Sequence, residues 1–378
     1  MCRSRICTWL FGLVVVGTLF APGGQAAEQG ERHLLYVTVP DFAGGTRHKP
    51  GIYVYDIDDG HKLVKRIDIP GMGPTRGSCV SAQAGCMYIS HSNTSILCFD
   101  VVREKVVWSN VYKPEEGGCD RPCVTPDGKK LYVPEGWWTS ATKSMKVLDG
   151  ATGKLLKNIP VGVGTGHNTI MSPTGKRMYM GPVANGTLFV VDTQSDEVIQ
   201  RIGPFGGTPG PNPVGMGGRC SPFTINSAET LCFVNSHHVG FYVGDLKEQK
   251  ILHWVQVDGA KGYSHGVGLT PDEKEVWLAN AENKRLHVYD ATKMPPRWKQ
   301  AIDVSAVTHG WITFSLDGRF AWPDSGDVID PKTKKIVATW KDDNGSPVRS
   351  SKFIEIHFRD GKPVRVGDQF GIGRAETR

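Results

Sequence analysis

Seven short strands that each end in an aspartate recur along this chain, and this repeat restricts the fold more than any other feature of the sequence. Each aspartate is followed by a tight turn, such as GATGK or TQSDE, and then by a further strand. An aspartate in that place can accept hydrogen bonds from the N–H groups of the turn, which fixes a hairpin. The spacings run from 40 to 53 residues, and the seven positions are Asp56, Asp100, Asp149, Asp192, Asp245, Asp290 and Asp330.

A second hairpin precedes most of these strands, with turns as in TPDGKKLYV (125–133) and TPDEKEVWL (270–278). Each unit therefore has four strands, a to d from the inside outward. Seven such units predict an all-β fold, a seven-bladed β-propeller of four-stranded antiparallel blades. The first unit begins at HLLYVTV (33–39), which matches strand b, and KFIEIHF (352–358) has the form of a strand a. We expect this C-terminal strand to complete the first blade and close the ring.

The repeat resembles the YVTN family of β-propeller repeats, in which SPDG-like turns, YV strands and V-x-D strand ends recur. TPDGKKLYV and the seven terminal aspartates carry the resemblance, which covers roughly residues 33–370. The resemblance implies the architecture. It does not imply an activity, because propellers host many unrelated functions.

The N-terminal 27 residues have the pattern of a secretion signal peptide, with Arg3 and Arg5 ahead of an apolar run and small residues near Ala27. After cleavage, residues 28–378 would form one propeller domain, secreted or periplasmic, with no membrane contact. An uncleaved membrane anchor is the alternative. The formal charge of +6 falls to about +4 without the two arginines, and no Lys/Arg block is present, so nucleic-acid binding is not expected.

Nine cysteines are present, and two of them lie in the signal segment. In an oxidising compartment the others are candidates for disulfides. Cys79 and Cys86 flank one expected hairpin turn, and Cys220 and Cys232 flank another, so both pairs are candidates for cross-strand disulfides. The CxxxC segment at 119–123 is interpreted first as structural or disulfide-linked and second as a pair of metal ligands.

Histidines recur just ahead of strand a, a position that lies at the mouth of the central channel on the face we call the top. His167 and His265 each precede a turn proline by six residues, and His309 occupies the same place within one residue. The loops between strands b and c, which lie on the same face, add further histidines. In other blades the place before strand a contains Arg76, Asp120, and Arg219 or Cys220. The b–c loops contain His91, Glu135, His237 and His238.

Imidazoles that converge on one opening suit a transition metal, copper, iron or zinc. We expect His167, His265 and His309 as ligands, assisted by His91, His237 or His238. Glu135 is the candidate general base, and Arg76 and Arg219 would attract an anionic substrate.

Three functions follow from this pattern. The first is an exported metal-dependent enzyme that acts on a small molecule, for which the arginines favour an anion, by redox or Lewis-acid chemistry. The second is a non-catalytic binding or scaffold propeller with a protein partner, whose polar residues fill the channel by bonding to one another. A lactonase-like hydrolase is a weaker third possibility, because it shares only the architecture.

Overall fold

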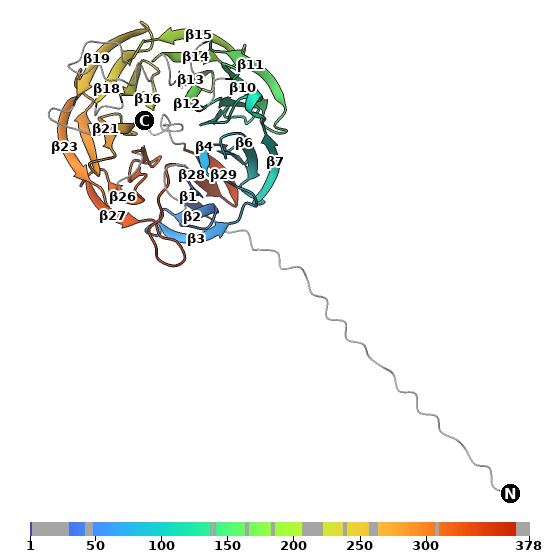
Figure 1. Cartoon of the computed structure of the whole chain (residues 1–378). Helices are drawn as coiled ribbons and strands as arrows, with labels where there is room; N and C mark the ends of the chain where they lie inside the picture. The colour runs from blue at the N-terminus through green and yellow to red at the C-terminus, as the bar shows by residue number, and fades with distance from the viewer. Residues whose placement is uncertain are drawn as a thin grey trace.

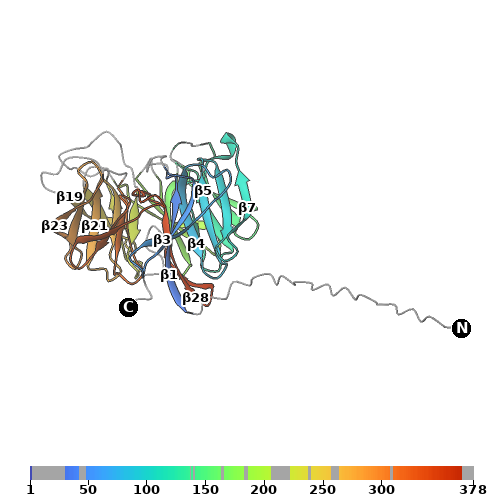
Figure 2. The ribbon, with the colours of Figure 1, turned by 90° about the horizontal axis from the view of Figure 1, so that it is seen from below.

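The computed structural model describes residues 1, 30–41, 48–136, 138, 141–162, 166–182, 186–205, 222–236, 240–256, 264–306 and 310–367. Seven antiparallel sheets stand around a central axis, so the predicted seven-bladed β-propeller is confirmed. Figure 1 shows the ring from one end of this axis, with β3, β7, β11, β15, β19, β23 and β27 on the rim. Figure 2 shows the same ring from the side.

The first blade joins the two ends of the chain. From the inner edge outward it contains β29 (Lys362–Val366), β28 (Phe353–Arg359), β1 (Glu31–Val39), β2 (Gly51–Asp56) and β3 (Lys62–Ile67). The expected closing strand is therefore present as β28, which pairs antiparallel with β1 from Glu31↔Arg359 to Val37↔Phe353. The fifth strand, β29, was not expected from the sequence.

The other six blades have four strands each, ordered from the inner strand outward. The next three are β4 (Thr75–Ser81), β5 (Cys86–His91), β6 (Ser95–Asp100) and β7 (Lys105–Val111); β8 (Cys123–Val124), β9 (Lys130–Pro134), β10 (Ser144–Asp149) and β11 (Leu155–Pro160); and β12 (Gly166–Met171), β13 (Arg177–Pro182), β14 (Leu188–Asp192) and β15 (Glu197–Ile202). The last three are β16 (Phe223–Ile225), β17 (Leu231–Asn235), β18 (Gly240–Asp245) and β19 (Lys250–Gln256); β20 (Ser264–Leu269), β21 (Glu275–Asn280), β22 (Arg285–Asp290) and β23 (Arg297–Asp303); and β24 (Ile312–Phe314), β25 (Ala321–Pro323), β26 (Asp327–Asp330) and β27 (Lys335–Thr339). A single 3-10 turn, η1 (Pro114–Glu116), is the helical element of the described residues, and none of their helical structure is long and apolar enough to cross a bilayer.

The apolar core lies between adjacent blades. Strands in the middle of a blade are buried on both faces, as in β2, whereas outer strands such as β3 are mostly exposed. One cluster joins Ile52 and Ile354 of the first blade with Ile89 and Phe99 of the next. Since every blade buries its faces against two neighbours, the ring must close before the first and last blades are fully packed.

The seven aspartates act as the sequence predicts. Each accepts one or two hydrogen bonds at Oδ1 from backbone N–H groups two or three residues further along the chain, at 2.7–3.3 Å. At Asp192 these donors are Gln194 and Ser195, and the Ser195 bond is the main reason that the pKa of Asp192 lies below its usual value. The ionised side chain therefore stabilises the hairpin.

Replacing Asp192 by alanine should lower the free energy of unfolding by roughly 1–2 kcal/mol, because two backbone donors lose a charged acceptor. The effect should be present above the usual carboxyl pKa and vanish as the pH falls through the lowered one, where the side chain is protonated. Urea denaturation measures it. Asp192→Asn keeps an acceptor oxygen and should lose less, and Glu197→Ala, an exposed charge on the same hairpin, should be nearly neutral. Equal losses in Asp192→Ala and Glu197→Ala would contradict the assigned role.

The disulfide predicted between Cys79 and Cys86 is wrong. All six described cysteines are thiols, including Cys232, so the predicted disulfide between Cys232 and Cys220 is not formed either; Cys220 itself lies outside the described residues. The strand register gives the reason: Cys79 faces Tyr88, whereas Cys86 faces Ser81. The two cysteines are therefore offset by two residues along the ladder.

Candidate functional site

Six side chains from six blades gather at the top end of the channel, each within two residues of the start of a strand a, which in the first blade is β28. β4 contributes Arg76, β12 contributes His167 and β20 contributes His265. The segments just before β8, β24 and β28 supply the others. Equivalent strands of a ring begin on the same face, so these residues surround one axis. We call this set the central ring: Arg76, Arg121, His167, His265, Trp311 and Lys352, all at most 5% exposed.

Two of the histidines predicted as metal ligands are neighbours. The ring centroids of His167 and His265 are 6.1 Å apart in an edge-to-face arrangement. His167 Nδ1 is in a short hydrogen bond with Asp120 Oδ2. Burial lowers the pKa of His167, and Asp120 offsets part of this effect. The imidazole is therefore expected to be neutral near pH 7, with Nδ1–H donated to Asp120 and Nε2 as the lone-pair nitrogen.

Trp311 links the histidines to the cationic side of the ring. His265 lies edge-on to the indole with ring centroids 4.9 Å apart. The guanidinium carbon of Arg121 is 3.8 Å from the indole centroid, and Lys352 Nζ is 5.3 Å from it. Cations over an indole are stabilised by its π-electrons, so Trp311 holds two positive groups near the axis.

Lys352 is a strongly perturbed ionisable group of the ring. Its Nζ is 3.4 Å from Asp41 Oδ1, and both side chains are buried. Burial and, to a smaller extent, the positive charge of Arg121 lower the pKa of Lys352 to about 7, although Asp41, Asp324 and Asp120 act in the opposite direction. An amine with such a pKa can hold or release a proton at neutral pH, which is typical of functional sites.

The carboxylates near Lys352 are fixed by backbone bonds. Asp41 Oδ2 accepts hydrogen bonds from the N–H and hydroxyl groups of Ser351, each at 2.7 Å. Asp324 Oδ2 accepts one from Gly310 N–H at 3.0 Å. The ring therefore sets buried cations against buried carboxylates, in a place where charges interact strongly.

Arg76 and Glu135, two predicted catalytic residues, have different surroundings. Burial lowers the pKa of Arg76 to about 10, and its guanidinium lies 4.1 Å from the ring centroid of Trp138. The Glu135 carboxylate accepts hydrogen bonds from Thr142 N–H (3.0 Å) and Lys143 N–H (3.1 Å). These bonds anchor the segment leading into β10, a structural role that the sequence did not indicate.

The remaining predicted site residues divide into two groups. His91, at the end of β5, accepts a hydrogen bond at Nδ1 from Gly73 N–H (3.2 Å), in the segment before β4, and lies close to Ser92, so both contacts are within its own blade. Burial lowers its pKa. The other four lie outside the described residues: Arg219, His237, His238 and His309.

Three ring members were missed in the sequence: Arg121, Trp311 and Lys352. A signal for Lys352 was available, because KFIEIHF was interpreted as a strand a and the residue at its start occupies the same place as the histidines. Arg121 follows the residue that was assigned to this place, Asp120. Trp311 carries no charge, so a search for ligands and acids passes over it.

Comparisons with known proteins support the fold. No family model matches the chain and no curated protein matches it, so the resemblance to YVTN repeats stays a prediction. Among solved structures, a chain of hydrazine synthase from Kuenenia stuttgartiensis is similar, with a TM-score of 0.58 and 13% sequence identity over 76% of this chain and 88% of that chain. At this identity the likeness shows that the two chains share the propeller fold, and that this fold occurs in an enzyme.

Proposed function

We propose that this chain is an enzyme that acts on a small anionic molecule at the central ring. The observation that carries the proposal is the buried amine of Lys352. It has a pKa of about 7 and lies in the same ring as His167, which is paired with Asp120. A buried amine that titrates near pH 7 and a buried imidazole paired with a carboxylate rarely share one site without a chemical role.

The ring offers an anion two guanidinium groups. Arg76 and Arg121 are 4% and 5% exposed, and each lies against an indole ring, Trp138 and Trp311 respectively. A guanidinium held by an aromatic face keeps a fixed orientation and can bind a carboxylate or an oxyanion with two parallel hydrogen bonds. The charges of Asp41, Asp120 and Asp324 would restrict binding to small anions that reach the cations directly.

We assign proton transfer to His167 and Lys352 in preference to Glu135, whose carboxylate already holds the Thr142 and Lys143 amides. In an elimination or a hydrolysis, His167 Nε2 would take a proton from the substrate or from the attacking water. The Lys352 ammonium would give one to the leaving group. Solvent then returns a proton from His167 to Lys352, so that the cycle balances.

A more specific version of this proposal adds a transition metal ion bound at the ring. His167 and His265 would hold copper, iron or zinc together with His309, which lies outside the described residues. The Asp120–His167 contact is of the kind that orients metal-bound histidines. Such an ion would supply Lewis-acid or redox chemistry next to the bound anion.

A non-catalytic binding propeller is the second candidate, and one observation favours it. Ring residues are paired with neighbouring carboxylates or with one another: Lys352 with Asp41, His167 with Asp120, and Arg121 with Trp311. Paired side chains can fill a channel and stabilise the ring without performing chemistry.

An anion screen followed by a conversion assay tests the proposal. Phosphate, sulfate, acetate, oxalate and pyruvate are added to the tag-free protein, and thermal unfolding is followed. At least one should stabilise the wild type and the exposed-arginine control Arg297→Gln, and have at least tenfold weaker affinity for Arg76→Gln and Arg121→Gln. If no anion distinguishes these proteins, the anion site is refuted.

Any stabilising organic anion is then incubated with the protein and followed by NMR. Conversion of the anion that is lost in Asp120→Asn supports the enzyme, and binding without conversion supports the second candidate.

A further inference from the structure

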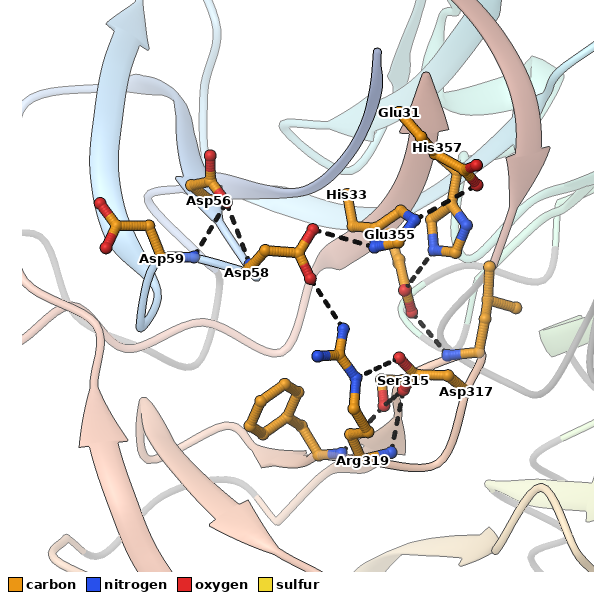
Figure 3. Close-up of polar contacts among 12 residues, drawn as sticks. Glu31, His33, Asp56, Asp58, Asp59, Ser315, Asp317, Arg319, Glu355 and His357 are labelled. Atoms are coloured by element: carbon orange, nitrogen blue, oxygen red, sulfur yellow. Dashed lines mark hydrogen bonds and ion pairs between the residues drawn. The ribbon is translucent and has the colours of Figure 1, made fainter. Parts of the chain in front are cut away.

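The strand pair that closes the ring brings two histidines together at the opposite end of the channel from the central ring. His33 on β1 and His357 on β28 are direct partners in the antiparallel ladder, 324 positions apart in the chain. Their ring centroids are 3.9 Å apart. Glu31 lies two residues before His33 on the same side of the strand, and its Oε1 is 3.4 Å from His33 Nε2. Figure 3 shows the two imidazoles side by side with Glu31 next to both.

Each imidazole is held from its outer side by a carboxylate. His33 Nδ1 lies 3.0 Å from Asp58 Oδ2, and His357 Nε2 lies 2.7 Å from Glu355 Oε1. Histidines that bind metals usually have a carboxylate at their other ring nitrogen, which fixes the tautomer and the ring orientation. Here His357 Nε2 is hydrogen-bonded to Glu355, and His33 Nδ1 lies within ion-pair distance of Asp58. The nitrogens that remain for a ligand are His33 Nε2 and His357 Nδ1, the two on the side of Glu31 in Figure 3.

These outer carboxylates are fixed in turn by a neighbouring blade. Asp58 Oδ1 accepts a bond from Arg319 at 2.8 Å, and Glu355 Oε2 accepts one from Leu316 N–H at 2.7 Å. Both partners belong to the turn that follows β24. The imidazoles are therefore oriented by a network of three chain segments, shown in Figure 3, and not by one flexible contact.

One ligand atom from each of Glu31, His33 and His357 lies within 4.8 Å of the other two, and within the described ranges no other group of His, Cys, Asp or Glu meets this condition. Ligands of a tetrahedral zinc ion are about 3.4 Å apart, given metal–ligand distances of about 2.0–2.2 Å. Glu31 is exposed, so its side chain can move inward, although Arg359 now holds its other oxygen at 3.3 Å.

We propose that Glu31, His33 and His357 bind a divalent transition metal ion of the zinc type, with water in the fourth position. Two imidazoles and one carboxylate are a ligand set that suits zinc. The ion would join the first described strand to the strand that closes the ring. Since the three ligands come together only in the closed ring, the ion binds the folded state selectively and stabilises it.

Titration with Zn²⁺ tests this site in the full chain, expressed without a histidine tag and dialysed against EDTA. We expect about one ion at this site per wild-type chain and a higher midpoint of thermal unfolding when zinc is present. Both effects should be lost in the double variant His33→Ala/His357→Ala and retained in His253→Ala, which removes a histidine on the outer strand β19. Retention in His167→Ala/His265→Ala separates this site from the central ring, so either proposal can fail alone.

A milder variant covers the case in which the double variant does not fold. Asp58→Asn keeps all three ligands and weakens the carboxylate that orients His33, so zinc affinity should fall about 10- to 100-fold with unchanged circular dichroism. Zinc binding and zinc-dependent stabilisation that are the same in the wild type, the double variant and Asp58→Asn would overturn the proposal. So would a wild type that binds no zinc.

Discussion

The wild-type protein should gain stability relative to a Lys352→Met variant as the pH rises from 7 to 10. Lys352 is fully buried beside Asp41, and burial lowers its pKa from 10.5 to about 7. Between these two values the unfolded chain binds a proton at this lysine and the folded chain does not. Stability rises with pH wherever the unfolded state binds more protons. Lys352 therefore lowers the free energy of unfolding below pH 7, and this loss disappears by about pH 10.

The expected size of this change is large. The pKa of Lys352 falls from 10.5 in the unfolded chain to about 7 in the folded protein. This difference corresponds to roughly 5 kcal/mol in the free energy of unfolding between these two pH values. Methionine has a similar length and does not titrate, so the difference between wild type and variant isolates the lysine. The opposite sign would follow if Asp41 raised the pKa of Lys352 as an exposed partner does. The sign of the slope therefore tests whether desolvation or ion pairing dominates at this site.

Urea denaturation at pH 7, 8, 9 and 10 measures the effect. The exposed lysine variant Lys154→Met is the matched control, and its stability should stay parallel to that of the wild type. A Lys352→Met curve that also stays parallel would show that Lys352 keeps an ordinary pKa in the folded protein. In that case the proton-transfer role proposed for it would lose its support.

The architecture could be predicted because its determinants are local. An aspartate such as Asp192 bonds to the turn within three residues, so each hairpin is specified by a few neighbouring letters. Ring closure could also be predicted. The first unit lacks strand a and the chain ends in a strand without a unit of its own, so pairing the two is the one arrangement that leaves no open sheet edge. The strand β29 was missed because its segment follows the last repeat and has no counterpart in the other units.

The candidate site could be predicted only in part because it depends on contacts between blades. The repeat places His167 and His265 at the channel mouth, but their partners come from elsewhere: Asp120 lies 47 positions from His167, and Trp311 lies one blade beyond His265. Charge balance is also invisible in one sequence, so nothing marked Lys352 as a buried amine. The error at Cys79 and Cys86 has a similar cause, because a register shift of two residues separates side chains that flank the same turn.

Replacing Phe353 by alanine should destabilise the protein by roughly 3–5 kcal/mol, the cost of removing a buried aromatic side chain and leaving a cavity. Phe353 is the first residue of β28 and is 1% exposed. Its ring lies 5.1 Å from that of Trp340 and 6.2 Å from that of Trp322, edge-to-face in both cases. Such aromatic pairs add to the free energy of burial, and Phe353→Leu, which keeps most of the volume, should lose much less.

The large effect is expected because this side chain belongs to the closing strand and contacts the preceding blade at the same time. Phe353 pairs with Val37 of β1, whereas Trp322 and Trp340 belong to the blade formed by β24 to β27. A cavity at this point therefore weakens both the strand pair that joins the chain ends and the packing of the last blade against the first. Val364→Ala on β29, a half-exposed position of the same sheet, is the control for urea denaturation. If Phe353→Ala and Val364→Ala cost the same, closure does not depend on this contact, and the stability of the ring must come from the other blade interfaces.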